Sequence, residues 1–168
     1  MSLDLDAVSA WMCAHVEGAQ TVVKATKFSG GQSNPTYLLD TEGMSYVLRR
    51  KPRGALLKSA HAVDREFRVQ SALRDTGVPV ARMYALCEDE SVIGSAFYVM
   101  EHVEGRNFDD PRLPEVVATE RRRYFSEMAR VLAAIHSVDF EAVGLGNYGP
   151  RGNYFRRQID RWSGQYRA

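Results

Sequence analysis

Apolar side chains in the N-terminal stretch recur at three- and four-residue intervals. The positions with this spacing are Leu5, Val8, Trp11 and Met12, followed by His15. Such spacing places side chains on one face of a helix, so we predict an amphipathic helix over residues 5–16 that Gly18 ends. We expect this helix to pack on the domain that follows it.

After residue 20 the pattern changes to alternating, β-branched residues, which is typical of strands. Three such stretches predict strands over residues 21–28, 35–41 and 44–50. Glu42-Gly43 predicts a turn between the second and third strands. Connections this short favour a three-stranded antiparallel meander.

The connection between the first two strands, F-S-G-G-Q-S-N-P-T-Y, contains Gly30, Gly31, Ser33 and Asn34. A glycine pair between strands is typical of a hairpin turn. Glycines also let backbone N–H groups approach an anion closely, and the Ser33 and Asn34 side chains can donate hydrogen bonds to phosphate oxygens. The loop alone therefore leaves two interpretations, a turn or a phosphate-binding loop.

The third strand carries Arg49 near its end, and the next predicted helix carries Glu66 among apolar neighbours. Two kinds of pairing are open to Glu66 in this arrangement. It pairs either with Arg65 or Arg68 at the helix surface, or with Arg49 across the sheet. The second pairing would place an anchored cation downstream of the glycine-rich connection.

The rest of the chain predicts two more strands and then only helices. The helix that carries Glu66 begins at Ser59 or His61 and ends before Gly77 and Pro79. The predicted elements after it are strands over 82–87 and 96–101, a hinge near 101–105, and helices over 113–137 and 153–167. In the last helix we expect Phe155, Ile159 and Trp162 to point inward. The fold class is α+β, a five-stranded sheet with one inserted helix followed by helices.

The composition mainly excludes some classes of partner and some cellular locations. The 168 residues carry a net charge of +1, which gives no general attraction to nucleic acid or to a membrane surface. No apolar run approaches the roughly 18 to 20 residues of a membrane span, and the first residues lack the features of a signal peptide, so we expect a cytoplasmic protein. Cys13 and Cys87 lack C-x-x-C spacing, and we expect buried, reduced thiols.

Six motifs carry a resemblance to a known family. They are F-S-G-G-Q-S-N-P-T-Y, Y-V-L-R-R-K-P, D-R-E-F-R, T-G-V-P-V, F-Y-V-M-E-H-V-E-G and A-A-I-H-S-V-D. In their order and spacing the chain resembles the aminoglycoside phosphotransferase and choline kinase superfamily of protein-kinase-like folds. It looks closest to the branch that includes the kinase-like domain fused to some acyl-CoA dehydrogenases.

The resemblance implies three parts. Residues 1–19 would be an N-terminal helix packing on the N-lobe, 20–103 a kinase-like N-lobe with a glycine-rich loop, and 104–168 the hinge and first helices of an incomplete C-lobe. It implies a nucleotide site, whose residues would be Gly30, Gly31, Ser33, Asn34, Arg49, Glu66, Glu101 and Val103. The first four would cover the ATP phosphates, and backbone groups of the last two would meet the adenine edge.

Arg49 falls where the family usually has a phosphate-binding lysine, and Glu66 where a glutamate orients that cation. The arginine is a departure from the family, because its planar fork is not interchangeable with an ammonium. Lys51 could take the position only if the strand register slipped.

A larger departure is a missing motif. Phosphoryl transfer in this family uses H-G-D-x-x-x-x-N, but His15, His61, His102 and His136 are followed by Val, Ala, Val and Ser. We therefore expect the nucleotide-binding part of an ATP-dependent small-molecule phosphotransferase that is inactive alone, without catalytic or metal-binding residues. Mg²⁺ and the alcohol acceptor would belong to the full-length parent, and self-association could cover surface meant for the missing lobe. The alternative is a non-catalytic nucleotide-binding or interaction module with a kinase-like fold.

Overall fold

The computed structural model describes residues 3–29, 34–52 and 61–167 and divides into two compact units, residues 1–138 and 139–168. The elements of the first unit are α1 (Leu5–His15), β1 (Val22–Lys27), β2 (Thr36–Thr41), β3 (Ser45–Arg50), α2 (Val63–Leu73), β4 (Met83–Cys87), β5 (Phe97–Glu101) and α3 (Ala118–His136). The second unit contains α4 (Tyr154–Arg167). The division predicted at residues 19/20 and 103/104 stays a prediction.

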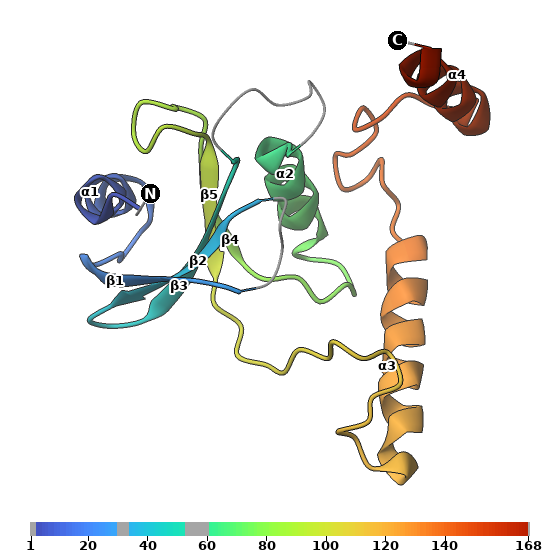
Figure 1. The fold of residues 1–168 in the computed structure, drawn as a ribbon, viewed down its shortest axis with the longest axis horizontal. Helices are drawn as coiled ribbons and strands as arrows, with labels where there is room; N and C mark the ends of the chain where they lie inside the picture. The colour runs from blue at the N-terminus through green and yellow to red at the C-terminus, as the bar shows by residue number, and fades with distance from the viewer. Residues whose placement is uncertain (1–2, 30–33, 53–60, 168) are drawn as a thin grey trace. The chain divides into compact units, whose positions relative to one another are not determined.

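The five strands form one antiparallel sheet in the order β1-β2-β3-β5-β4 (Figure 1). Each predicted strand is confirmed, and each begins one residue later than its pattern predicted. The long connection from β3 to β5 contains α2 and β4, so β5 pairs with β3 on one side and with β4 on the other. The fold is α+β, as predicted.

Alternating side chains give the sheet two apolar faces, each covered by one helix (Figure 1). Leu48, Phe97 and Val99 are fully buried on the face that α1 covers, together with Val8 and Met12 of the helix. The opposite face belongs to α2, with Val63, Ala96 and Tyr98 buried and Phe67, Met83, Leu86 and Met100 packed against them. Because Phe97 and Tyr98 are consecutive in β5, they lie on opposite faces.

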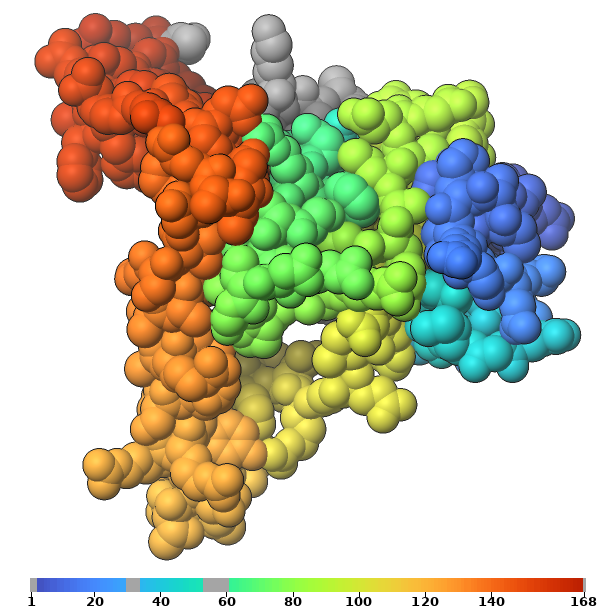
Figure 2. All heavy atoms as spheres, turned by 180° about the vertical axis from the view of Figure 1, so that it is seen from behind, coloured from blue at the N-terminus to red at the C-terminus, as the bar shows by residue number. Residues whose placement is uncertain are grey.

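Helix α1 is capped at its N-terminus and hydrogen-bonded to the sheet. The Asp4 carboxylate accepts a hydrogen bond from the Ala7 backbone N–H at 3.0 Å, a typical N-cap. The Ser9 hydroxyl accepts from the Val22 N–H at 2.9 Å and so links the helix to β1. Figure 2 shows α1, in blue, beside the strands of the sheet. The predicted helix is confirmed, although it ends at His15.

Helix α2 begins at Val63, so the prediction of a start at His61 is wrong; Ser59, the other candidate, lies outside the described residues. His61 has a φ of +62°, in the left-handed region, which a helix cannot include. The residue instead forms the approach to the helix, and this brings its ring to the candidate site described below.

Helix α3 begins at Ala118, five residues later than predicted. Leu113 has a left-handed φ of +51°, and residues 114–116 form turns and a bend instead of a helix. Arg121 donates from Nε to the carbonyls of Leu113 and Val116, both at 3.0 Å, and so holds this segment against the first turns of α3. Apolar periodicity at the start of the stretch gave no sign of this turn.

Two burial predictions are also wrong. Phe155, Ile159 and Trp162 are 80%, 61% and 64% exposed, because a unit built around one helix cannot bury that helix's apolar face. Both cysteines are free thiols, but Cys13 is exposed and only Cys87 is buried. No helix in the described ranges is long and apolar enough to cross a membrane.

Candidate functional site

An ion pair between Arg49 and Glu66 lies at the centre of the candidate site. Nε of Arg49 donates to Oε2 of Glu66 at 2.7 Å, and both side chains are about one-third exposed, at 29% and 33%. Glu66 therefore pairs across the sheet, as the second of the two sequence interpretations proposed. The pair joins the end of β3 to the first half of α2.

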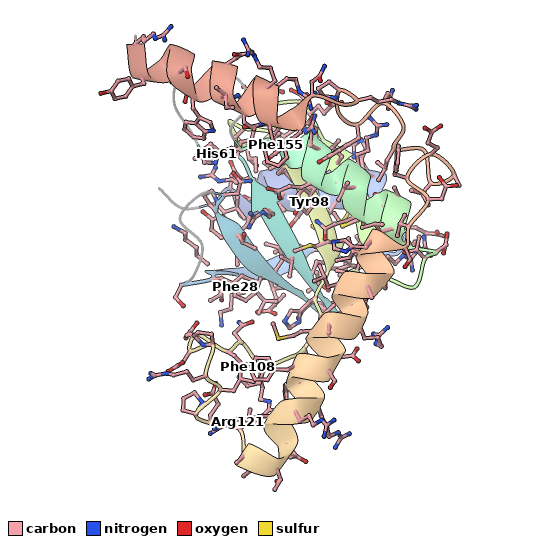
Figure 3. The ribbon with its side chains drawn as sticks, turned by 90° about the vertical axis from the view of Figure 1, so that its right-hand side faces the viewer. Phe28, His61, Tyr98, Phe108, Arg121 and Phe155 are labelled. Carbon is pink, nitrogen blue, oxygen red and sulfur yellow. The ribbon has the colours of Figure 1, made fainter. Side chains whose placement is uncertain are left out.

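The strand register explains why these side chains meet. Arg49 in β3 lies directly opposite Tyr98 in β5, so both point to the face that α2 covers. The Tyr98 hydroxyl donates to the same Oε2 atom of Glu66 at 3.0 Å. Figure 3 shows Tyr98 beside α2. One carboxylate oxygen thus receives a charged donor and a neutral donor from neighbouring strands.

Asn34 is the hydrogen-bond partner of the other Glu66 oxygen, Oε1. Its Nδ2 donates to Oε1 of Glu66 at 2.9 Å, and the residue is only 2% exposed. Because an ionised carboxylate only accepts hydrogen bonds, the amide oxygen of Asn34 must face the other way, where it lies 2.9 Å from Nδ1 of His61. His61 then carries its proton on Nδ1. Both polar ends of the Asn34 side chain are therefore used inside the protein.

Arg49 has a second anchor. Its Nη1 donates to Oγ1 of Thr36 at 3.0 Å, and that hydroxyl donates to the Asn34 carbonyl at 3.1 Å. The remaining nitrogen, Nη2, makes no hydrogen bond to any described residue. Two nitrogens of the guanidinium are therefore held by described residues.

Burial raises the pKa of the Tyr98 phenol, and the negative charge of Glu66 raises it further. The hydroxyl therefore keeps its proton across the neutral pH range and stays a donor to Glu66. Gln70 lies 3.5 Å from the same hydroxyl through its Nε2. At the buried end of the site, the Tyr98 hydroxyl is thus always the donor and the Glu66 carboxylate the acceptor.

The register also decides between the two candidate cations. β3 ends at Arg50, and Lys51 follows it with its backbone N–H bonded to the Ala96 carbonyl at 3.0 Å. No slip brings Lys51 to the position that faces Glu66. Arg49 therefore occupies that position, as predicted.

The other predicted site residues fall into two groups. Gly30, Gly31 and Ser33 lie outside the described residues. Glu101 is the last residue of β5; its backbone N–H donates to the Arg82 carbonyl at 2.8 Å, and its Oε2 accepts from the Arg82 N–H at 2.9 Å.

Val103 lies two residues beyond Glu101 and is 62% exposed. Along the strand, Glu101 is three residues, about 10 Å, beyond Tyr98. Of the two residues predicted to meet the adenine edge, Glu101 therefore ends the strand that carries Tyr98 and Val103 lies beyond it, and neither hydrogen-bonds to Glu66.

Sequence reasoning missed three residues of the site, Thr36, His61 and Tyr98. Tyr98 lies in the strand predicted over residues 96–101, but only the pairing of β3 with β5 shows that it faces Arg49. Thr36 lies opposite Arg49 in β2, and this signal was available from the meander alone. His61 could not be found from any pattern, because its position depends on the segment before α2.

A separate apolar groove of about 930 Å³ lies between α3 and the segment before it. Phe108 packs edge-on against Tyr124 with ring centroids 5.4 Å apart, and Phe125, Met128 and Leu132 of α3 line the groove with side chains about half exposed. Within the described ranges, no three His, Cys, Asp or Glu side chains are grouped as metal ligands.

The sequence matches the model of the phosphotransferase enzyme family over residues 24–168. It is 50% identical to the probable acyl-CoA dehydrogenase IBR3 of Arabidopsis thaliana and 43% identical to acyl-CoA dehydrogenase family member 11 of Mus musculus. Each alignment covers 98% of this chain, but only 21% and 22% of the relative. The chain therefore spans about a fifth of the length of these curated relatives.

The fold is similar to solved structures. A Ralstonia eutropha protein assigned as an aminoglycoside phosphotransferase matches with a TM-score of 0.83 and 52% identity, over 99% of this chain and 48% of that one. A thermostable mutant of the aminoglycoside phosphotransferase APH(4)-Ia, in a ternary complex with AMP-PNP and hygromycin B, matches with a TM-score of 0.54 and 19% identity, over 80% of this chain and 40% of that one. The second likeness shows the fold alone.

Proposed function

The chain belongs to the phosphotransferase enzyme family, and we propose that it forms the nucleotide-binding part of an ATP-dependent small-molecule phosphotransferase. The observation that carries this proposal is the Arg49–Glu66 ion pair, 2.7 Å long, on the α2 face of the sheet. It supplies an anchored cation a short distance along the chain from the glycine-rich connection.

The geometry of Arg49 suits a phosphate. Guanidinium groups bind phosphate oxygens through directed N–H donors, and they lose little freedom when they are already fixed. Glu66 and Thr36 hold two nitrogens of Arg49 on a side chain that is 29% exposed, and Nη2 would be the donor to a phosphate oxygen. Such an arrangement is preorganised, because the cation need not move when a nucleotide arrives.

The remaining nucleotide contacts are proposals from the family pattern. Backbone N–H groups of Gly30 and Gly31 and the hydroxyl of Ser33 would cover the phosphates. The backbone of Glu101 and Val103 would meet the adenine edge. Because the Glu101 N–H is already bonded to Arg82, only its carbonyl would be available for that contact.

Transfer itself is assigned to residues that this sequence does not contain. None of its four histidines begins an H-G-D-x-x-x-x-N motif, and the described side chains do not form a metal-ligand group. We therefore propose no Mg²⁺ ligand and no catalytic residue among the residues of this chain. The chain alone would bind nucleotide weakly and transfer no phosphoryl group, while a longer parent would supply the Mg²⁺ ligands and the general base.

Partners are proposed on the same basis. The parent would transfer phosphate to an alcohol, as expected from the family, and the APH(4)-Ia complex contains both a nucleotide analogue and hygromycin B. Phe125, Met128, Leu132 and Ile135 expose an apolar stripe on α3 through which the chain alone would self-associate. Binding to nucleic acid or to membranes is not expected, and a cytoplasmic location stays a prediction.

Two measurements test this function. Isothermal titration with ATP and Mg²⁺ should give measurable binding, and an assay of ATP hydrolysis should show no Mg²⁺-dependent turnover above a no-protein control. Absence of any nucleotide binding would contradict the proposal and favour an interaction module. Clear turnover would show that residues of this chain supply the missing catalytic groups.

A further inference from the structure

We propose that Tyr98 and Asn34 are positioning residues that hold the Glu66 carboxylate, and through it Arg49, in the orientation that meets nucleotide phosphates. The inference rests on the proposed function and assigns two residues to the same site. Neither would touch the nucleotide. Each would act by limiting the orientations that Glu66 can adopt.

The need for positioning follows from the ion pair itself. Both Arg49 and Glu66 are about one-third exposed, and a single ion pair at that exposure is weak and readily replaced by water. The terminal torsion of a glutamate is also broad, so one hydrogen bond does not fix the carboxylate plane. A partner on each oxygen removes that freedom. Tyr98 supplies one on Oε2 and Asn34 supplies one on Oε1.

The two donors are themselves held rigidly. Tyr98 is 1% exposed in a central strand, and its ring packs against Phe67 with centroids 6.1 Å apart. Its hydroxyl position depends on only two torsions, both restricted by this packing. Asn34 is 2% exposed and is fixed at its other end by His61. Glu66 therefore has a buried donor at each oxygen, one from β5 and one from the connection that precedes β2.

Asn34 was predicted to bind phosphate directly, but its described contacts favour this other role. Its amide nitrogen and oxygen are both engaged with protein groups. The residue lies within the glycine-rich connection, three residues after Gly31. Through Asn34, the orientation of Glu66 would depend on the conformation of the glycine-rich connection. Phosphate binding by that connection would therefore be coupled to the position of Arg49.

The test compares ATP with adenosine, because a positioning role concerns only the phosphates. Tyr98→Phe removes the hydroxyl and keeps the buried ring, and Tyr46→Phe is the matched control. Tyr46 is also 1% exposed in a central strand, but it lies on the opposite face, and its hydroxyl makes no hydrogen bond to a described residue. We expect Tyr98→Phe to raise the Kd for ATP about tenfold, with the Kd for adenosine unchanged. Tyr46→Phe should change neither.

A double-mutant cycle with Glu66→Gln shows whether Tyr98 acts through Glu66. In the Glu66→Gln background, Tyr98→Phe should have little further effect on ATP affinity. Asn34→Ala, measured in the same way, should weaken ATP binding and leave adenosine binding unchanged. This second variant keeps the test valid if one variant does not fold.

The outcomes separate this inference from the proposed function. Unchanged ATP affinity in both variants, with the original chain binding ATP, would overturn the positioning role and leave the function intact. An equal loss of affinity for ATP and for adenosine would show a merely structural role and would also overturn the positioning role. No ATP binding by the original chain would overturn both.

Discussion

Arg49 and Tyr98 are cross-strand partners in β3 and β5, and their side chains donate to the same oxygen of Glu66. Directly opposed residues in an antiparallel pair have Cβ atoms roughly 5 Å apart, so the sheet itself brings the two donors together. A slip of one residue would place Phe97 or Val99 opposite Arg49, and both point to the other face. The candidate site therefore depends on the register of the central strands.

The core that fixes this register should be sensitive to loss of volume. Val99 is fully buried in β5, next to Tyr98, whereas Val23 in β1 is 58% exposed. We expect Val99→Ala to lower the free energy of unfolding by about 2 kcal/mol, because it removes two buried methyl groups and leaves a cavity. The same substitution at Val23 should cost less than about 0.5 kcal/mol. Urea denaturation measures both, and equal effects would show that β5 is not part of the core.

Asn34→Asp should destabilise the protein in a pH-dependent way. The change keeps the shape of the side chain but places a carboxylate within hydrogen-bond distance of Glu66, with Arg49 and His61 as the nearby groups that can offset its charge. Like charges raise the folded-state pKa of the pair, so the native state holds a proton that the unfolded state has lost. The free energy of unfolding should therefore be lower than that of the original chain by about 1–3 kcal/mol at pH 7.

The loss in free energy of unfolding caused by Asn34→Asp should become smaller as the pH falls toward the ordinary carboxyl pKa of about 4. Denaturation curves at pH 5 and pH 7 give the comparison, and Asn34→Ala serves as the uncharged control. A deficit that is the same at both pH values would mean that Asn34 does not face the ionised Glu66.

Tyr98 should make the protein less stable in alkaline solution. Burial and the charge of Glu66 raise the pKa of its phenol above the value of about 10 in an unfolded chain. Above pH 10 the unfolded state releases this proton while the native state retains it, so the free energy of unfolding falls as the pH rises. The group contributes its full stability below pH 10 and loses it above.

Tyr98→Phe should remove that loss, so the variant should show a shallower decline between pH 9 and pH 11. The difference in slope should reach at most about 1.4 kcal/mol per pH unit. Identical slopes for the two proteins would place the Tyr98 hydroxyl in an environment more polar than the one described.

The sheet and the ion pair were predictable because they depend on local patterns. Alternating, β-branched or short apolar stretches predicted all five strands, and the position of Arg49 near the end of the third strand made it a candidate partner of Glu66 in the next helix. The missing information was which strands pair. Tyr98 enters the site only because the chain crosses from β3 through α2 and β4 before β5 pairs with β3, and no residue spacing encodes that order.

The errors arose where backbone conformation or missing contacts overrode periodicity. Leu113 and His61 adopt left-handed backbone conformations that a hydrophobic pattern does not reveal, and both shift the start of a helix. Phe155, Ile159 and Trp162 have the spacing of a buried face but have no core to join in their own unit. Periodicity shows which side of a helix is apolar, but it does not show what covers that side.

The most direct test of the account is a calorimetric titration of ATP into the chain and into Arg49→Ala, with Arg49→Lys beside them. We predict measurable ATP binding that is lost in Arg49→Ala and weakened in Arg49→Lys, because an ammonium cannot donate to Glu66, Thr36 and a phosphate with the geometry of the guanidinium. Equal ATP affinity in the original chain and Arg49→Ala would contradict the assignment of Arg49 as the phosphate-binding cation.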